Sequence, residues 1–239
     1  MIPKKIHYCW FGGNPLPEEA QKCIESWKKY CPDYEIIEWN ESNYNLSKNE
    51  YVKYTYKNKK FAFLTDYVRL DIIYNEGGIY LDTDVELLKP LDDLLDSSCF
   101  MGMEQPGMVA TGLGFGAQKK NDFIKENKEY YEKEPFLDES GNWIKTTCVK
   151  ITTNLLVKKG LCKKNELQNI AGIKILPVDY LCPLKLGTNK LTITENTYSI
   201  HHYTASWKSK YKIIRRISYR LIPIKQFIRK LVGRTNEEG

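Results

Sequence analysis

The chain has 239 residues, of which 36 are Lys or Arg and 30 are Asp or Glu, so its net charge is +6. Its 42% hydrophobic and 13% aromatic residues exclude disordered and collagen-like proteins, and its length suits one α/β domain with an appendage. The seven cysteines are scattered, which predicts reduced thiols in a cytoplasmic protein. The first residues do not resemble a signal peptide, and no apolar run approaches the ~18–20 residues that a membrane span requires.

The first forty residues alternate between strand-like and helix-like segments. Residues 5–11 are β-branched and aromatic and stop at Gly12-Gly13-Asn14-Pro15, which predicts a strand and a turn. A helix is expected from Pro17-Glu18-Glu19 up to Pro32, with apolar residues at helical spacing. Residues 34–39 predict a second strand. This β-α-β opening is typical of an α/β sheet.

The middle of the chain continues this alternation. Residues 46–59 cannot be assigned, whereas residues 61–76 have helical composition and are followed by Gly77-Gly78. Residues 79–88 alternate apolar and polar, which predicts one strand with its acidic residues on one side. The elements expected after it are a short helix at 91–96, a strand near 98–104, a glycine-rich strand or loop at 112–118, helices near 121–133 and 146–159, and strands near 173–178 and 197–203.

The end of the chain differs from the rest in charge. Residues 208–239 hold ten basic and two acidic residues, so this segment carries +8 and residues 1–207 carry −2. Between about 210 and 232, apolar residues step by three and four, which predicts a basic amphipathic helix kinked or split at Pro223. We therefore expect a body at 1–207 and a helical tail at 208–239. The tail suits an anionic membrane surface at ~1 kcal/mol per basic residue, unless its apolar stripe packs on the body.

Asp82-Thr83-Asp84 is the sharpest chemical feature. Two carboxylates two residues apart on an extended segment can reach one divalent cation, which prefers oxygen ligands. Burial of two like charges is costly without a cation or hydrogen-bonding partners. The alternative is a solvated strand end. The run from Gly112 to Gly116 does not fit a dinucleotide-binding turn, because no helix opens on it, and is interpreted as a glycine-permissive strand or loop near the substrate.

Two neighbouring segments, Phe61–Leu70 and Gly77–Asp84, closely resemble the signature of glycosyltransferase family 32. That family includes capsular-polysaccharide sugar transferases and Golgi α-mannosyltransferases, and its core is similar to that of large glucosylating bacterial toxins. Ile6–Gly13 looks like the family's first strand and Ser199–Trp207 like its closing motif, while residues 105–195 match only loosely. The resemblance implies a GT-A-like α/β domain that binds nucleotide sugars, with a mixed central sheet flanked by helices.

The resemblance also implies roles for the acidic and basic residues of the two segments. Asp82 and Asp84 match the pair that holds Mn²⁺ or Mg²⁺ on the donor diphosphate, where the ion neutralises the leaving group. Asp66 and Arg69 match residues that contact the donor sugar and phosphate. The alternative for this second pair is a surface ion pair worth only ~0.2–0.5 kcal/mol.

Further donor contacts are implied outside these carboxylates. Trp10 matches a residue that stacks on the nucleobase, and Tyr80 matches a donor contact, although core packing is the alternative for both. The resemblance also implies that a histidine or a nearby group completes the metal and diphosphate shell. Neighbouring strand residues face opposite ways, so at most one of His201 and His202 is expected to point at the cation. Ser206 and Trp207 close over the donor, and Trp207 is a candidate for a mobile lid.

These roles predict a metal-dependent glycosyltransferase, and the family resemblance implies that it is a retaining one. We expect a UDP-sugar donor and a glycan acceptor, carried on a lipid, in capsular or surface polysaccharide synthesis at the inner face of the plasma membrane. A toxin-like enzyme that glycosylates a protein is one alternative. Others are a non-catalytic sugar-nucleotide binder and a nucleic-acid or anionic-membrane binder that uses the basic tail, but no nucleic-acid-binding motif is present and no nucleic-acid partner is expected.

Overall fold

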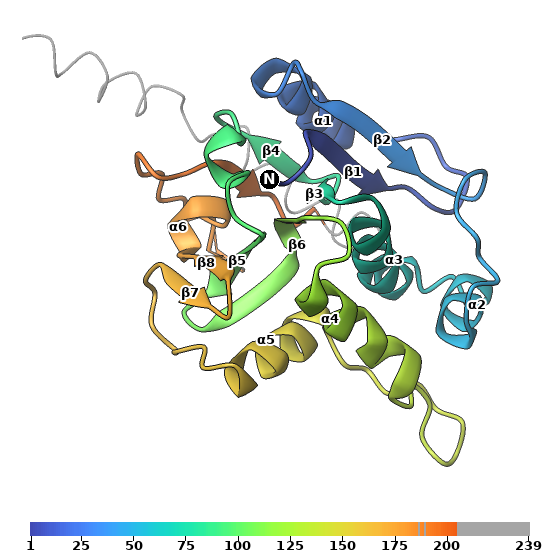
Figure 1. Ribbon diagram of the computed structural model, residues 1–239. Coiled ribbons are helices and arrows are strands. Elements are labelled where there is room, and N and C mark those ends of the chain that lie inside the picture. Colours follow the sequence, from blue (N-terminus) through green and yellow to red (C-terminus); the bar gives the residue numbers. More distant parts are fainter. Residues whose placement is uncertain (186, 189, 205–239) are drawn as a thin grey trace, which may run out of the picture. The chain divides into compact units, whose positions relative to one another are not determined.

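A computed structural model describes residues 1–185, 187–188 and 190–204, and residues 1–203 form one compact unit (Figure 1). A seven-stranded mixed sheet with the order β2-β1-β3-β6-β5-β8-β7 runs through this unit, and β4 and β9 form a separate pair. The predicted mixed sheet flanked by helices is confirmed. The strands are β1 (Lys5–Cys9), β2 (Glu35–Trp39), β3 (Gly78–Tyr80), β4 (Val85–Leu87), β5 (Cys99–Gln105), β6 (Met108–Ala117), β7 (Gln168–Ile170), β8 (Ile173–Leu176) and β9 (Ser199–His201).

Helices pack on the sheet from both sides and enclose two apolar clusters. Helices α3, α4 and α5 lie together on one side of the sheet, and α1 lies toward the other, near β4 (Figure 1). Side chains of β1 and β3 alternate between the two clusters, since Ile79 belongs to one and Tyr80 to the other. The helices are α1 (Glu18–Tyr30), α2 (Glu50–Lys57), α3 (Phe61–Glu76), the 3₁₀ turn η1 (Asp92–Leu94), α4 (Asp122–Lys133), α5 (Cys148–Lys158) and α6 (Val178–Leu181).

Helix α3 spans the predicted residues 61–76 and ends where two glycines follow. Gly77 has φ +68°, and a Cβ there would lie 2.9 Å from the backbone nitrogen of Lys119. A side chain at this position would therefore be both strained and crowded. The chain reverses at once into β3, which pairs in parallel with β1 and antiparallel with β6.

The expected continuous strand over residues 79–88 is wrong. The chain instead forms β3 and β4, which belong to different sheets, and residues 81–84 connect them. The backbone nitrogen of Val85 donates to the carbonyl of Asp82 at 3.0 Å, which closes a turn between the two strands. Alternation of apolar and polar residues continues through this turn, so the periodicity alone did not reveal it.

Three further elements were not predicted: α2, β7 and α6. Asn49 begins α2 as an N-cap, because its side chain accepts from the backbone nitrogen of Val52 at 2.9 Å. No helix within the described residues is both long and apolar enough to cross a membrane. The expected tail helix, Ser206 and Trp207 lie outside the described residues.

Candidate functional site

The site lies at the sheet edge where β1 and β3 end. These strands run in parallel, so their carboxyl ends meet at one edge, and the turn with Asp82 and Asp84 leaves the sheet there. The indole of Trp27 holds the far side of this turn by donating from Nε1 to the carbonyl of Val85 at 2.7 Å. The position of both carboxylates is therefore fixed by buried backbone contacts on either side of the turn.

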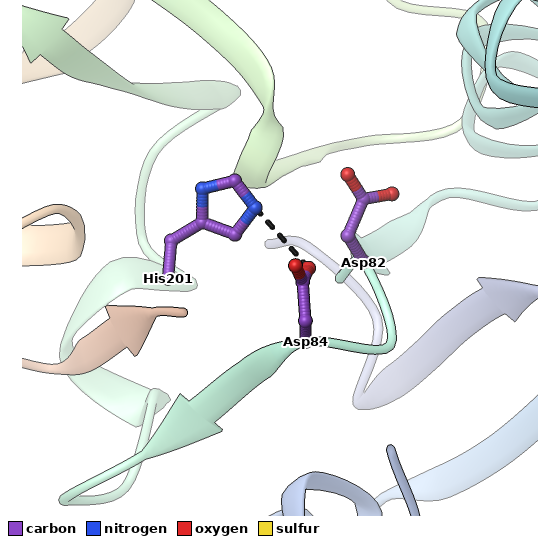
Figure 2. Close-up of side chains that lie close together, drawn as sticks. All are labelled: Asp82, Asp84 and His201. Carbon is purple, nitrogen blue, oxygen red and sulfur yellow. Dashed lines mark ion pairs between the residues drawn. The ribbon is translucent and has the colours of Figure 1, made fainter. Parts of the chain in front are cut away.

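His201 joins the two carboxylates from β9. Val85 of β4 pairs with His201, so the end of the chain's body is laid beside the Asp82–Asp84 turn. His201 Nε2 lies 3.1 Å from Asp84 Oδ1, and one ligand atom from each of Asp82, Asp84 and His201 fits within 4.8 Å of the other two. Figure 2 shows the three side chains projecting into a common space. They are partly open to solvent, with side-chain exposures of 26% for Asp82, and 17% and 12% for Asp84 and His201.

The neighbouring His202 faces elsewhere. Its Nε2 lies 2.8 Å from Glu86 Oε2, while its backbone nitrogen donates to the carbonyl of Asp84 at 2.9 Å. Sequence reasoning expected that only one of the two histidines would face the carboxylates. The structure places His201 in that position.

Arg69 connects helix α3 to the turn. Its guanidinium Nη2 lies 3.1 Å from Asp66 Oδ1 and 3.4 Å from Asp82 Oδ1, and its Nε donates to the carbonyl of Thr65 at 2.9 Å. The Arg69 side chain is only 4% exposed, so the Asp66–Arg69 pair is buried and is not the surface ion pair considered as the alternative. The Arg69 guanidinium thus holds the carboxylates of Asp66 and Asp82 in place.

Tyr80 contacts both Asp82 and Arg69. Its hydroxyl donates to Asp82 Oδ1 at 3.0 Å, and the Arg69 guanidinium lies 5.0 Å from the centre of its ring. The residue is 1% exposed, and besides Asp82 and Arg69 it contacts the ring of Phe115 in the core. A direct contact with the donor stays a prediction.

Burial and neighbouring charges shift the pKa values of these groups. Burial raises the pKa of Asp66 to about 6, although Arg69 opposes this shift. Burial also raises the pKa of Asp82, again against the effect of Arg69. Burial alone would lower the pKa of His201, but the carboxylates of Asp84, Asp82 and Glu104 together outweigh it and the pKa rises. The cluster therefore favours a positive charge at His201.

Gly112 was not singled out as a site residue, yet it allows the carboxylate and guanidinium to approach the sheet. A Cβ at this position on β6 would lie 2.7 Å from Asp82 Oδ2 and 3.1 Å from Arg69 Nη1. The glycine run in the sequence was interpreted as permissive backbone near the substrate. The structure shows which side chains occupy the space that Gly112 leaves.

Trp10 follows β1 at the same sheet edge. Its backbone nitrogen donates to the carbonyl of Trp39 at 2.9 Å, and its indole Nε1 donates to the carbonyl of Asn14 at 2.6 Å. The side chain is only partly buried against the core. Trp10 thus has a fixed ring with an exposed part, and its stacking on a base stays a prediction, as do the roles expected of Ser206 and Trp207.

Comparison with known proteins gives these contacts a context. Residues 17–101 match the model of a family described as "Glycosyltransferase sugar-binding region containing DXD motif", and this span includes Asp66, Arg69, Asp82 and Asp84. The chain is also 28% identical, over 90% of its length and 87% of the other protein, to "Uncharacterized glycosyltransferase L373" of Acanthamoeba polyphaga mimivirus. Residues 17–101 are therefore similar to the sugar-binding region of DXD-containing glycosyltransferases.

Other proteins similar to this chain are longer. The chain is 28% identical to "Inositol phosphoceramide mannosyltransferase 1" of Schizosaccharomyces pombe over 56% of this chain and 46% of that protein. The chain is 33% identical to "Inositol phosphoceramide mannosyltransferase 3" of the same organism, over 52% of this chain and 35% of that protein. The chain thus spans less than half the length of either.

The fold of this chain also has a solved counterpart. "PaToxG Glycosyltransferase" superimposes with a TM-score of 0.51 at 18% identity, over 66% of this chain and 69% of that one. At this identity the likeness shows the fold alone. The predicted GT-A-like fold and the resemblance to DXD-containing glycosyltransferases are confirmed.

Proposed function

We propose that the protein transfers a sugar from a nucleotide-sugar donor to a hydroxyl of an acceptor, with a divalent cation at Asp82, Asp84 and His201. The observation that carries the proposal is the convergence of these three side chains within 4.8 Å in a domain of the DXD glycosyltransferase type. Neither the turn nor β9 alone would make such a site.

The residues present fit a cation. Two carboxylates and one imidazole are a donor set suited to Mn²⁺, and the carboxylates also suit Mg²⁺. Burial would lower the pKa of His201, but the negative charge of the nearby carboxylates raises it; a bound cation would be attracted by the same negative charge and would displace the proton of the imidazole. When bound, the ion would neutralise the negative charge on the departing nucleoside diphosphate.

The protein's own residues would position the donor around this cluster. Arg69 and Tyr80 hold Asp82 through Oδ1, so Oδ2 also keeps a fixed orientation. The carboxylate therefore loses little conformational entropy when the donor and its cation bind. Asp66 shares the Arg69 guanidinium and keeps 12% of its side chain exposed at the site. We propose that the exposed part of the Asp66 side chain contacts hydroxyls of the donor sugar, and that the partly exposed face of Trp10 stacks on the base.

The names of the relatives suggest the acceptor. The two S. pombe relatives are named as mannosyltransferases of inositol phosphoceramide, which is a lipid. We therefore propose a lipid-linked acceptor and give mannose, with a UDP- or GDP-linked donor, the first place in any screen. A role in capsular or surface polysaccharide synthesis and a location at the inner face of the membrane are further parts of this proposal.

Ligand-induced thermal stabilisation tests the proposal directly. A panel of UDP- and GDP-sugars is added to the full chain with and without Mn²⁺, because a ligand that binds only the native state raises the melting temperature. We expect a donor to stabilise the wild type only with the ion, and Asp84→Asn to abolish this effect. Glu86→Gln is the matched control, since Glu86 lies two residues further on and contacts His202.

Transfer assays then decide the chemistry. Asp82→Asn and Asp84→Asn should remove sugar transfer while the circular dichroism spectrum stays that of the wild type. Full transfer by either variant in chelator-treated buffer would refute the metal-dependent function.

A further inference from the structure

Metal-binding histidines are normally oriented through their second ring nitrogen. That nitrogen usually donates to a carboxylate, a backbone carbonyl or water, which fixes the tautomer and the plane of the ring. In His201, Nε2 faces Asp84, but Nδ1 is buried and has no hydrogen-bond partner among the described residues. No described residue therefore makes the usual orienting bond, and among these residues the imidazole must be held by packing.

Tyr203 packs directly on this imidazole. The two ring centroids are 4.1 Å apart, the shortest ring separation among the described residues, with an interplanar angle of 53°. Contact at this distance restricts rotation of the imidazole about its χ angles, because the ring would have to pass through the tyrosine.

The tyrosine itself is fixed at two points. Its hydroxyl lies 2.9 Å from Sγ of Cys182, which is 1% exposed at the end of α6. Its backbone has φ +52°, a left-handed conformation that is rare for a bulky residue and costs about 1–3 kcal/mol. A strained conformation persists only when the surrounding contacts over-determine it, and here it turns the ring back onto His201.

We infer that Tyr203 is a positioning residue that holds the His201 imidazole with Nε2 toward Asp84 and Asp82. The inference rests on the proposed function for its importance to metal binding, but the orientation of the ring can be measured without metal. Tyr203 replaces by packing the hydrogen bond that Nδ1 lacks. The Cys182 contact then acts one step further away, as the anchor of the tyrosine.

Imidazole NMR spectra of the metal-free full chain test the orientation. The protein has only three histidines, so ¹⁵N-histidine labelling gives few signals. We expect one sharp imidazole pattern for His201 in the wild type and in Tyr203→Phe, which keeps the ring. In Tyr203→Asn, which keeps a residue that tolerates positive φ but removes the ring, the pattern should broaden or average. An unchanged His201 pattern in Tyr203→Asn would overturn the inference.

Mn²⁺ titration, followed by the electron paramagnetic resonance of free Mn²⁺, tests the consequence. Loss of a group that orients a ligand typically weakens metal binding about 10–100-fold, so we expect Tyr203→Asn to weaken Mn²⁺ binding by at least about tenfold and Tyr203→Phe to stay near wild type. In a His201→Ala background the Tyr203→Asn effect should vanish, because the two act as one unit. An equal effect in both backgrounds would show general loosening and refute the inference. A wild type that binds no Mn²⁺ would instead refute the proposed function, while the imidazole spectra would still decide the role of Tyr203.

Discussion

Acidification from pH 7 to pH 5 should destabilise the fold, because His7 is held neutral in the folded chain and becomes protonated when the chain unfolds. His7 is fully buried in β1, where its Nε2 lies 2.9 Å from the carbonyl oxygen of Gly77 and its Nδ1 accepts from Trp39 Nε1 at 3.1 Å. This pattern requires a neutral ring with the proton on Nε2, because Nδ1 must accept. The ring connects β1 to the ends of β2 and α3, and so supports the sheet edge at the site.

The size of the effect follows from the pKa of His7. Burial lowers this pKa from its ordinary value of 6.5 to about 4, against the hydrogen bond to Gly77 that favours the charged form. The unfolded chain therefore binds a proton between pH 6.5 and pH 4 that the folded chain does not bind. Stability from this group is complete above pH 6.5 and is lost as the pH falls toward 4. At 1.36 kcal/mol per pH unit, the loss between pH 7 and pH 5 is about 2 kcal/mol.

Urea unfolding of the wild type and of His7→Gln at both pH values measures this loss. The buried carboxyl of Asp66, with its raised pKa of about 6, pushes the pH dependence the other way, so only the difference between the two proteins isolates His7. We expect the wild type to lose about 2 kcal/mol more than His7→Gln on acidification. The same pH dependence in wild type and His7→Gln would refute the reasoning.

Three further predictions concern the site and the tail. Gly112→Ala should displace Asp82 and the Arg69 guanidinium, and should abolish donor-dependent thermal stabilisation with little loss of native melting temperature. Gly116→Ala, whose Cβ would lie 2.5 Å from Phe100, should mainly lower the melting temperature. The reverse pattern would contradict the role given to Gly112. Arg69→Met should destabilise the protein by about 3 kcal/mol at neutral pH, because it leaves buried carboxylates unpaired, and urea unfolding should show a smaller loss at pH 5, where Asp66 is protonated. Truncation at Ser209 should abolish co-sedimentation with anionic liposomes. Equal binding by the truncated and the full chain would disprove membrane contact through the tail.

Local sequence signals predicted the elements that depend on neighbouring residues. Helix α3 has the bounds expected of residues 61–76, because the composition favours a helix and Gly77 can adopt the positive φ that ends it. The Asp82-Thr83-Asp84 triplet was predicted to be the chemical centre from carboxylate spacing. By contrast, the prediction of a single strand at 79–88 was wrong. Apolar and polar residues continue to alternate through the turn at 81–84, so the alternation does not show where β3 ends and β4 begins.

The sequence by itself thus determined the strand and helix alternation, the carboxylate pair and its DXD type, all of which are encoded within short windows of the chain. Only the tertiary structure decided that His201, and not His202, faces that pair, because the choice depends on the pairing of β9 with β4. The same is true of Gly112 beside Asp82 and of Tyr203 on His201. Such contacts join residues far apart in the chain, and their geometry is fixed by packing and strand register, which no local pattern of residue types specifies.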